Sequence, residues 1–192
     1  MGHLVGLKDY LKVAYQRSAF DQALTSQQLW EWHLHGHRRV RARIIENQQY
    51  ELTIDIENHA VEALPKIQVK LLYLAELSES VTKLVKSDPK VHALGLSPIP
   101  THQGRHFVKN KTLFPLMQER QVVFFTLLEG ETIRGLVAEF SQYDITVHLK
   151  GGIPVVILRH SMYDARDKQG RCLLKSFQDA HRDWQKSALF VS

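Results

Sequence analysis

Two stretches decide how this sequence is organised: residues 40–56 read VRARIIENQQYELTIDI, and residues 133–149 read IRGLVAEFSQYDITVHL. They align without a gap at a constant offset of 93 residues, from Val40 to Ile133. The identical pairs are Arg41 with Arg134, Glu46 with Glu139, Gln49 with Gln142, Tyr50 with Tyr143, and Thr53 with Thr146. A half-buried strand requires alternating apolar and polar residues, but it does not require this shared Glu-x-x-Gln-Tyr run. The pattern therefore favours an internal duplication over chance similarity between two strands.

The sequence around the two stretches repeats as well. A helical segment and an apolar strand lead to a glycine turn at Gly36 and at Gly130, and another apolar strand follows at 66–74 and at 154–163. Each unit is thus one helix and about five short strands. Strands this short bury a core only if they curl and close on one another, so we expect two small, strongly bent barrels.

One position supports the expected bend. Gly135 lies where a strand would turn tightly, which glycine permits because it has no Cβ, and the first unit has Ala42 at the matching position.

The repeat predicts four segments. The first barrel with its N-terminal helix is expected over 1–77, a connector with one short helix over 78–111, and the second barrel over 112–166. A C-terminal extension follows over 167–192, with a helix expected from Leu173 to Lys186. The expected fold is therefore mainly β with helices.

Composition narrows the classes of function. The chain has 192 residues, 44% hydrophobic and 23% charged, with no apolar run long enough to span a membrane and no signal-peptide pattern. We therefore expect a cytoplasmic protein without a membrane partner. The single cysteine, Cys172, excludes a disulfide framework and a Cys-rich zinc motif. No phosphate-binding glycine loop, nucleophile motif or paired-carboxylate motif appears, so we expect neither an enzyme nor a cofactor. The net charge of +5 is compatible with RNA as a partner.

Two clusters of polar residues leave alternatives open. His33, His35 and His37 alternate and would share one strand face, but no cysteine or acidic residue in the run completes a zinc site, which favours a polar strand face. Arg39, Arg41 and Arg43 also alternate, so they would share one face of a strand. That face either contacts phosphates or is simply solvated.

The second unit is similar to the Sm-like domain of the Hfq family of bacterial RNA chaperones over residues 113–167. Glu119-Arg120 ends its helix as the family's helix ends. The segment Phe140 to Tyr143 matches the family's Phe-Asp-Gln-Phe, and Leu158 to His160 matches its Tyr-Lys-His. The resemblance implies two tandem Sm-like (SH3-like) five-stranded barrels, each preceded by a helix.

The resemblance also implies a site for single-stranded, uridine-rich RNA on the pore face of a ring. Its residues in the second unit are Gln142, Tyr143, Arg159 and His160, with Arg120 at the rim. The first unit offers Gln49, Tyr50 and Lys70, and has Leu71 in place of the histidine. An aromatic ring stacks on an unpaired base, glutamine bonds a base edge, and cationic side chains hold phosphate. Without the resemblance, the residues favour structural roles: the tyrosines would plug the barrel mouths, and His160 would be held by backbone at a ring interface.

The chain departs from the family pattern at two other surfaces. The positions of the adenine-binding face hold Thr126, Glu131, Thr132 and Arg134, and the rim has Met117 and Gln118 where the family has basic residues. We expect the adenine site to be absent or remodelled, and the rim to be weak.

Tandem barrels suggest how the chain assembles. Three chains would form a pseudo-hexameric ring with alternating sites; a true hexamer, a dimer and a monomer are the alternatives. Two functions follow as expectations. One is an RNA chaperone or regulator. The other is a ring scaffold that binds little RNA, with the connector and C-terminal helix docking a protein.

Overall fold

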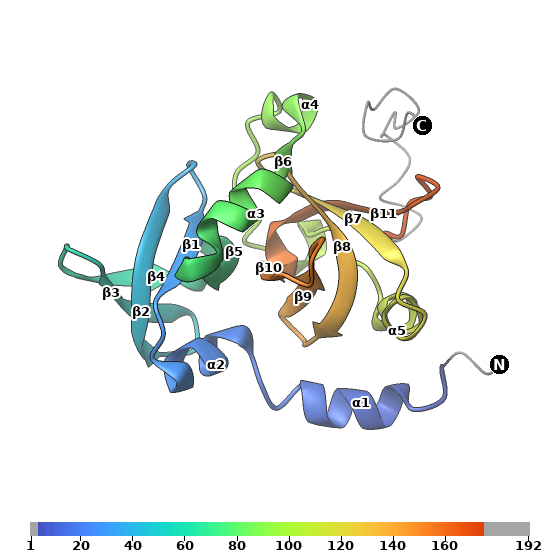
Figure 1. Ribbon diagram of the computed structural model, residues 1–192, viewed down its shortest axis with the longest axis horizontal. Helices are drawn as coiled ribbons and strands as arrows, with labels where there is room; N and C mark the ends of the chain where they lie inside the picture. Colours follow the sequence, from blue (N-terminus) through green and yellow to red (C-terminus); the bar gives the residue numbers. More distant parts are fainter. Residues whose placement is uncertain (1–3, 175–192) are drawn as a thin grey trace.

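The computed structural model describes residues 4–174, and it is mainly β with a few helices (Figure 1). The first repeat comprises helix α2 (Ala19–Ser26), strands β1 (Trp30–Leu34), β2 (Arg39–Asn47), β3 (Glu51–Ile56) and β4 (Val61–Pro65), the 3-10 turn η2 (Lys66–Gln68) and strand β5 (Val69–Leu74). The second comprises α5 (Asn110–Gln118), β7 (Val122–Leu127), β8 (Glu131–Phe140), β9 (Asp144–His148), β10 (Pro154–Leu158), η5 (Arg159–Ser161) and β11 (Met162–Asp167). Each repeat therefore has the helix and five strands that the sequence predicted.

The strands form one antiparallel sheet in the order β11-β7-β8-β9-β10-β5-β1-β2-β3-β4, with β6 (Lys86–Ser87) paired to β8 beside this path. Both repeats place their fifth strand beside the first, and then run in sequence to the fourth. The offset of 93 residues holds through η2 and η5 and through β5 and β11. The two repeats therefore share one topology.

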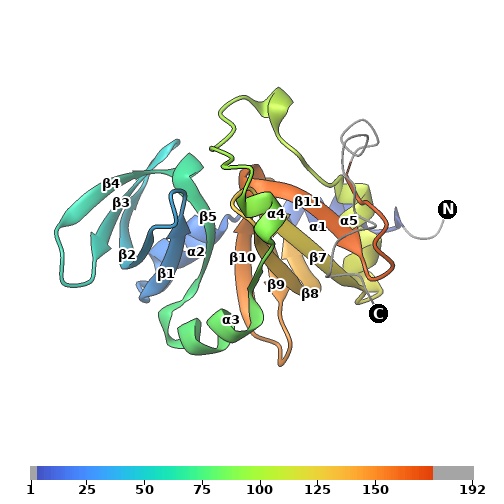
Figure 2. The same ribbon diagram turned by 90° about the horizontal axis from the view of Figure 1, so that it is seen from above.

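Two separately closed barrels were expected, and the described strands do not close. In neither repeat does the fourth strand pair with the fifth. Strand β10 of the second repeat instead pairs with β5 of the first, with Val156 opposite Leu72 and Ile157 opposite Leu71 (Figure 2). Because the outer edge of β5 is taken by β10, the sheet is continuous, with β4 and β11 as its end strands.

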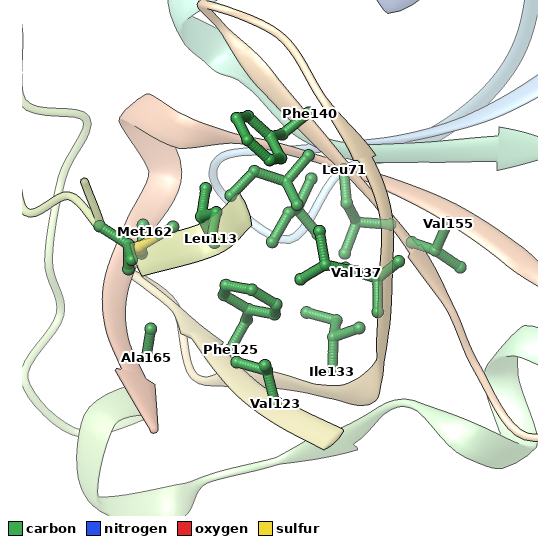
Figure 3. Close-up of a cluster of buried hydrophobic side chains, with 14 of the residues drawn as sticks. Leu71, Leu113, Val123, Phe125, Ile133, Val137, Phe140, Val155, Met162 and Ala165 are labelled. Atoms are coloured by element: carbon green, nitrogen blue, oxygen red, sulfur yellow. The ribbon is translucent and has the colours of Figure 1, made fainter. Parts of the chain in front are cut away.

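Two hydrophobic cores lie on either side of this junction, and each receives residues from both repeats. Leu71 packs with the second repeat's core, as Figure 3 shows, whereas Leu72 packs with the first repeat's core. Strand β10 does the reverse: Ile157 packs in the second core, and Val156 in the first. Alternate side chains of a strand point to opposite faces, so each strand of the junction contributes to both cores.

Gly135, where the sequence predicted a tight bend, lies at a close approach of two strands. A Cβ on this residue would lie 2.6 Å from Val147 Cγ1, and closer still to the carbonyl oxygen of His148. Strands β8 and β9 therefore approach at this point more closely than any side chain would permit.

The connector is more structured than predicted. One short helix was expected, but the chain forms η3 (Ala75–Leu77), α3 (Ser78–Leu84), β6, α4 (Pro89–His92) and η4 (His102–Gly104). Asp88 caps α4 by accepting hydrogen bonds from Lys90 N and Val91 N, and its own N–H donates to the carbonyl of Gly130 at 2.7 Å. The connector is thereby fixed to the glycine turn of the second repeat.

Helix α1 (Leu7–Ala14) was not predicted. Its Tyr10 hydroxyl donates to the carbonyl of Phe140 at 3.0 Å and accepts from the N–H of the same residue at 2.7 Å.

The predicted C-terminal helix lies almost wholly outside the described residues. Among the helices described, none is long and apolar enough to cross a membrane.

Candidate ligand site between the two repeats

A pocket of about 680 Å³ lies between the two repeats and brings both Gln-Tyr motifs together. Its lining includes Gln49, Tyr50, Lys66, Ile67, Gln142, Tyr143 and His160 from the repeats, Pro100 and Arg105 from the connector, and Tyr15, Gln16, Arg17 and Ser18 from the link between α1 and α2. We call this the inter-repeat pocket. Residues 93 positions apart in the sequence thus share one cavity, with two added segments along its walls.

The two tyrosines expose their rings. Tyr50 is 76% exposed and Tyr143 is 60% exposed, the highest exposures among the aromatic residues described. Neither ring is buried in a core, so both are available to stack on a planar ligand.

Equivalent turns position these tyrosines. In the second repeat, the Ser141 hydroxyl accepts from Tyr143 N at 3.1 Å and from Asp144 N at 3.2 Å, which fixes the turn between β8 and β9. In the first repeat, Gln48 N donates to Glu51 O at 3.0 Å, matching the bond from Ser141 N to Asp144 O. The side chain of Gln49 also donates to the Tyr50 hydroxyl at 3.0 Å.

Lys66 is the cation that the first repeat supplies, although the sequence pointed to Lys70. The offset of 93 makes Lys66 the counterpart of Arg159, and Ile67 the counterpart of His160. The ammonium of Lys66 contacts the carbonyl of Gln48, lies 3.4 Å from that of Gln49, and is 5.4 Å from the centroid of the Phe20 ring. Burial lowers its pKa.

Lys70 lies elsewhere. Its side chain is 1% exposed, and its ammonium pairs with the carboxylates of Glu129 and Glu131. The second repeat's Arg-His pair lies in the 3-10 turn η5, and its counterpart is the turn η2 rather than strand β5, which holds Lys70 and Leu71. Lys70 is therefore part of the packing between the repeats and not of the pocket.

Arg159 does not line the pocket, although its neighbours Leu158 and His160 do. Its backbone N–H donates to Tyr143 O at 2.9 Å, and its guanidinium carbon is 5.5 Å from the centroid of the Phe140 ring. Nε and Nη2 are buried without a hydrogen-bond partner, and burial lowers the pKa of the group. Unsatisfied buried donors are rare, so these atoms mark a place where water or a ligand atom would be favourable.

His160 joins the two repeats and also faces the pocket. Its Nε2 lies 2.8 Å from the carbonyl oxygen of Val69, which assigns the proton to Nε2 and leaves Nδ1 as an acceptor. Burial lowers its pKa from 6.5 to about 4, so the ring is neutral at pH 7. His160 therefore offers a hydrogen-bond acceptor and no positive charge.

The buried imidazole predicts a pH dependence of stability. As the pH falls below 6.5, His160 is protonated in the unfolded chain, but in the folded chain it stays neutral until about pH 4. The free energy of unfolding therefore falls as the pH falls through this window. Replacing His160 with Gln keeps a donor for Val69 O and removes the titration. We expect the loss of unfolding free energy between pH 7 and pH 5, measured by urea unfolding, to be smaller in this variant by about 1–2 kcal/mol. Equal losses in both proteins would contradict this assignment.

Other cations of the pocket were not found from the sequence. Arg17 and Arg105 both line it, and Arg105 is held by Nε–H donating to Ile99 O and Nη2–H donating to Pro100 O, each at 2.9 Å. Neither residue belongs to the repeats, so the repeat gave no signal for them. Arg120, expected at the rim, is exposed at the end of α5 with φ of 51° and does not line the pocket.

The histidine run is not one strand face. Of the three histidines, only His33 lies in β1, which ends at Leu34. Its Nε2 is 2.9 Å from the Tyr73 hydroxyl. His35 follows the strand, and His37 has a left-handed φ of 58°. Within residues 4–174, no group of three or more His, Cys, Asp or Glu side chains is arranged to hold a metal ion.

The arginines of β2 do share one exposed face. Arg39, Arg41 and Arg43 are all exposed between buried or half-buried neighbours, and Arg41 pairs with Glu31 at 3.3 Å.

The residues aligned with the family's adenine-binding face make other contacts in this structure. Thr126 and Thr132 are buried, and β6 pairs with Glu131 and Thr132.

Comparison with known proteins found no matching family model, no matching curated protein and no matching solved structure. Inference about function therefore depends on the chemistry of the inter-repeat pocket.

Proposed function

We propose that this chain binds single-stranded, uridine-rich RNA in the inter-repeat pocket, as an RNA chaperone or regulator of Sm-like architecture. The observation that carries the proposal is the meeting of Tyr50 and Tyr143, both exposed, in one cavity of about 680 Å³. Ligand cavities commonly measure about 300–1,000 Å³, so the size suits a nucleotide.

The lining side chains suit uracil. Base-to-aromatic stacking contributes about 1–3 kcal/mol per base, and two rings are available. Uracil presents an N3–H donor between two carbonyl acceptors. The neutral His160, through Nδ1, can accept from the N–H, and the amides of Gln49 and Gln142 can donate to the carbonyls. Lys66, with Arg17 and Arg105, supplies positive charge for the phosphates.

The strand order supports the Sm-like architecture and the ring. Each repeat has its fifth strand beside its first, and the two repeats join through a fourth strand and a fifth strand. In the proposed ring of three chains, β4 of one chain would meet β11 of the next by the same pairing. Alternating junctions would then hold different residue sets, because Ile67 replaces His160 in the first repeat.

The test is binding of labelled oligo-U and oligo-A at two salt concentrations. We expect oligo-U to bind more tightly, and more tightly at low salt. Tyr143→Ala should weaken oligo-U binding by about 5-fold to 100-fold, which corresponds to the loss of about 1–3 kcal/mol of stacking. Tyr143→Phe keeps the ring and should bind as the wild type does. Equal affinity of the alanine variant and the wild type would remove the stacking proposal.

A second candidate is a scaffold that docks a protein and binds little RNA. Two positions of the family's site favour it: Arg159 does not line the pocket, and His160 is neutral. This function predicts no salt-sensitive binding of oligo-U, together with recovery of one stoichiometric protein partner that nuclease treatment leaves bound.

A further inference from the structure

The outer edge of β11 is not free, although β11 is an end strand of the sheet. After a turn over 168–170, the chain folds back along it: Leu173 N donates to Ala165 O at 2.9 Å, and Asp167 N donates to Arg171 O at 3.1 Å. Cys172 lies opposite Arg166 in this short ladder. We call residues 171–174 the edge segment.

Several contacts hold the edge segment in place. The carboxylate of Asp167 accepts from Gln169 N and Arg171 N, each at 2.9 Å, and pairs with the guanidinium of Arg171 at 2.6 Å. On its other side, the edge segment pairs with the connector, where Leu174 lies opposite Val108. Ala165, whose carbonyl accepts from the edge segment, is fully buried and packs in the second core.

The edge segment occupies the position that a neighbouring repeat occupies on β5. With the offset of 93, Ala165 is the counterpart of Leu72, the residue that lies opposite Val156 of β10. The counterpart of Val156 is Ala63, an exposed residue in the middle of β4. Pairing of β4 from a second chain with β11 would therefore place Ala63 opposite Ala165, whose carbonyl already accepts from Leu173.

We infer that the edge segment competes with strand β4 of a second copy of this chain for the outer edge of β11. The inference rests on the Sm-like pairing proposed above. While the edge segment is paired with β11, strand β4 of a second chain cannot pair there, and no ring forms. Assembly requires the segment to leave, so ring closure is controlled by the chain itself.

The test is the mass of full-length variants, measured by light scattering over a range of protein concentrations. Leu173→Pro removes the N–H that donates to Ala165 O, because proline has none. Leu173→Ala keeps this N–H and loses only side-chain packing. We expect the wild type and the alanine variant to remain single chains, and the proline variant to assemble towards three chains. Adding Ala63→Pro to the proline variant should restore the single chain.

Three results would overturn the inference. The proline variant and the wild type could have equal masses at every concentration. The alanine variant could assemble as far as the proline variant. The double variant could stay assembled, which would place the contact away from β4. Unchanged circular dichroism would establish that each variant is folded. Oligo-U binding plays no part in this readout, so failure of the RNA proposal would leave the result intact.

Discussion

Replacing Lys70 with methionine is expected to lower the free energy of unfolding by about 3–5 kcal/mol. The ammonium of Lys70 is paired with Glu129 and Glu131, whose side chains are only 10% and 16% exposed. Methionine fills similar space without the charge, so two carboxylates would remain close together in a poorly solvated place. Although burial opposes it, the hydrogen bond from Lys70 helps to hold the pKa of Glu129 below its usual value.

The effect should reach both repeats, because Glu129 links their glycine turns. Its carboxylate accepts from Gly36 N at 2.6 Å and from His37 N at 3.3 Å. Urea unfolding measures the loss. The matched control is Lys83→Ala, which removes an exposed pair with Glu79 and should change stability by less than about 0.5 kcal/mol. A Lys70 variant within that same limit would mean that the buried pairs contribute nothing.

Gly135→Ala is expected to cost about 3 kcal/mol or more, which is at the upper end for overpacked sites. The new Cβ would meet the His148 carbonyl and Val147 Cγ1 across the β8–β9 pair, and backbone cannot move aside as a flexible side chain can. To relieve the contact, strands β8 and β9 would have to separate at this point.

The first repeat provides the comparison for this variant. Ala42 holds the matching position with its Cβ in a fully buried place, so β2 and β3 already accommodate a methyl group there. Ala42→Gly should cost only about 1 kcal/mol, through lost packing and added chain entropy. Thermal and urea unfolding of both variants would measure the difference; equal losses would mean that the close approach of β8 and β9 does not require glycine.

The sequence predicted the features that the two repeats share, because each of them depends on a local pattern of residues that occurs twice. The Gln49-Tyr50 and Gln142-Tyr143 motifs, the strands around them and the need for a glycine at position 135 all followed from one alignment. Extending the same offset past the strands would also have found Lys66 in place of Lys70.

What the sequence did not predict depends on contacts between distant segments. Pairing of β10 with β5 joins residues about 85 positions apart, and neither strand differs in pattern from one that closes its own barrel. Helix α1 is short, and the contact of Tyr10 with Phe140 spans 130 positions. Arg105 lines the pocket from a connector in which the sequence predicted only one short helix. Such placements follow from tertiary packing and leave no periodic signal.

The junction of β10 with β5 has a consequence for how ligand binding responds to dilution. Both walls of the inter-repeat pocket belong to one polypeptide, so bringing them together is an intramolecular event with its own high effective concentration. A pocket between separate subunits is lost by mass action as the protein is diluted, but this one would persist in a solitary chain. A cell could therefore keep very few copies of such a protein, and each copy would still carry the whole pocket.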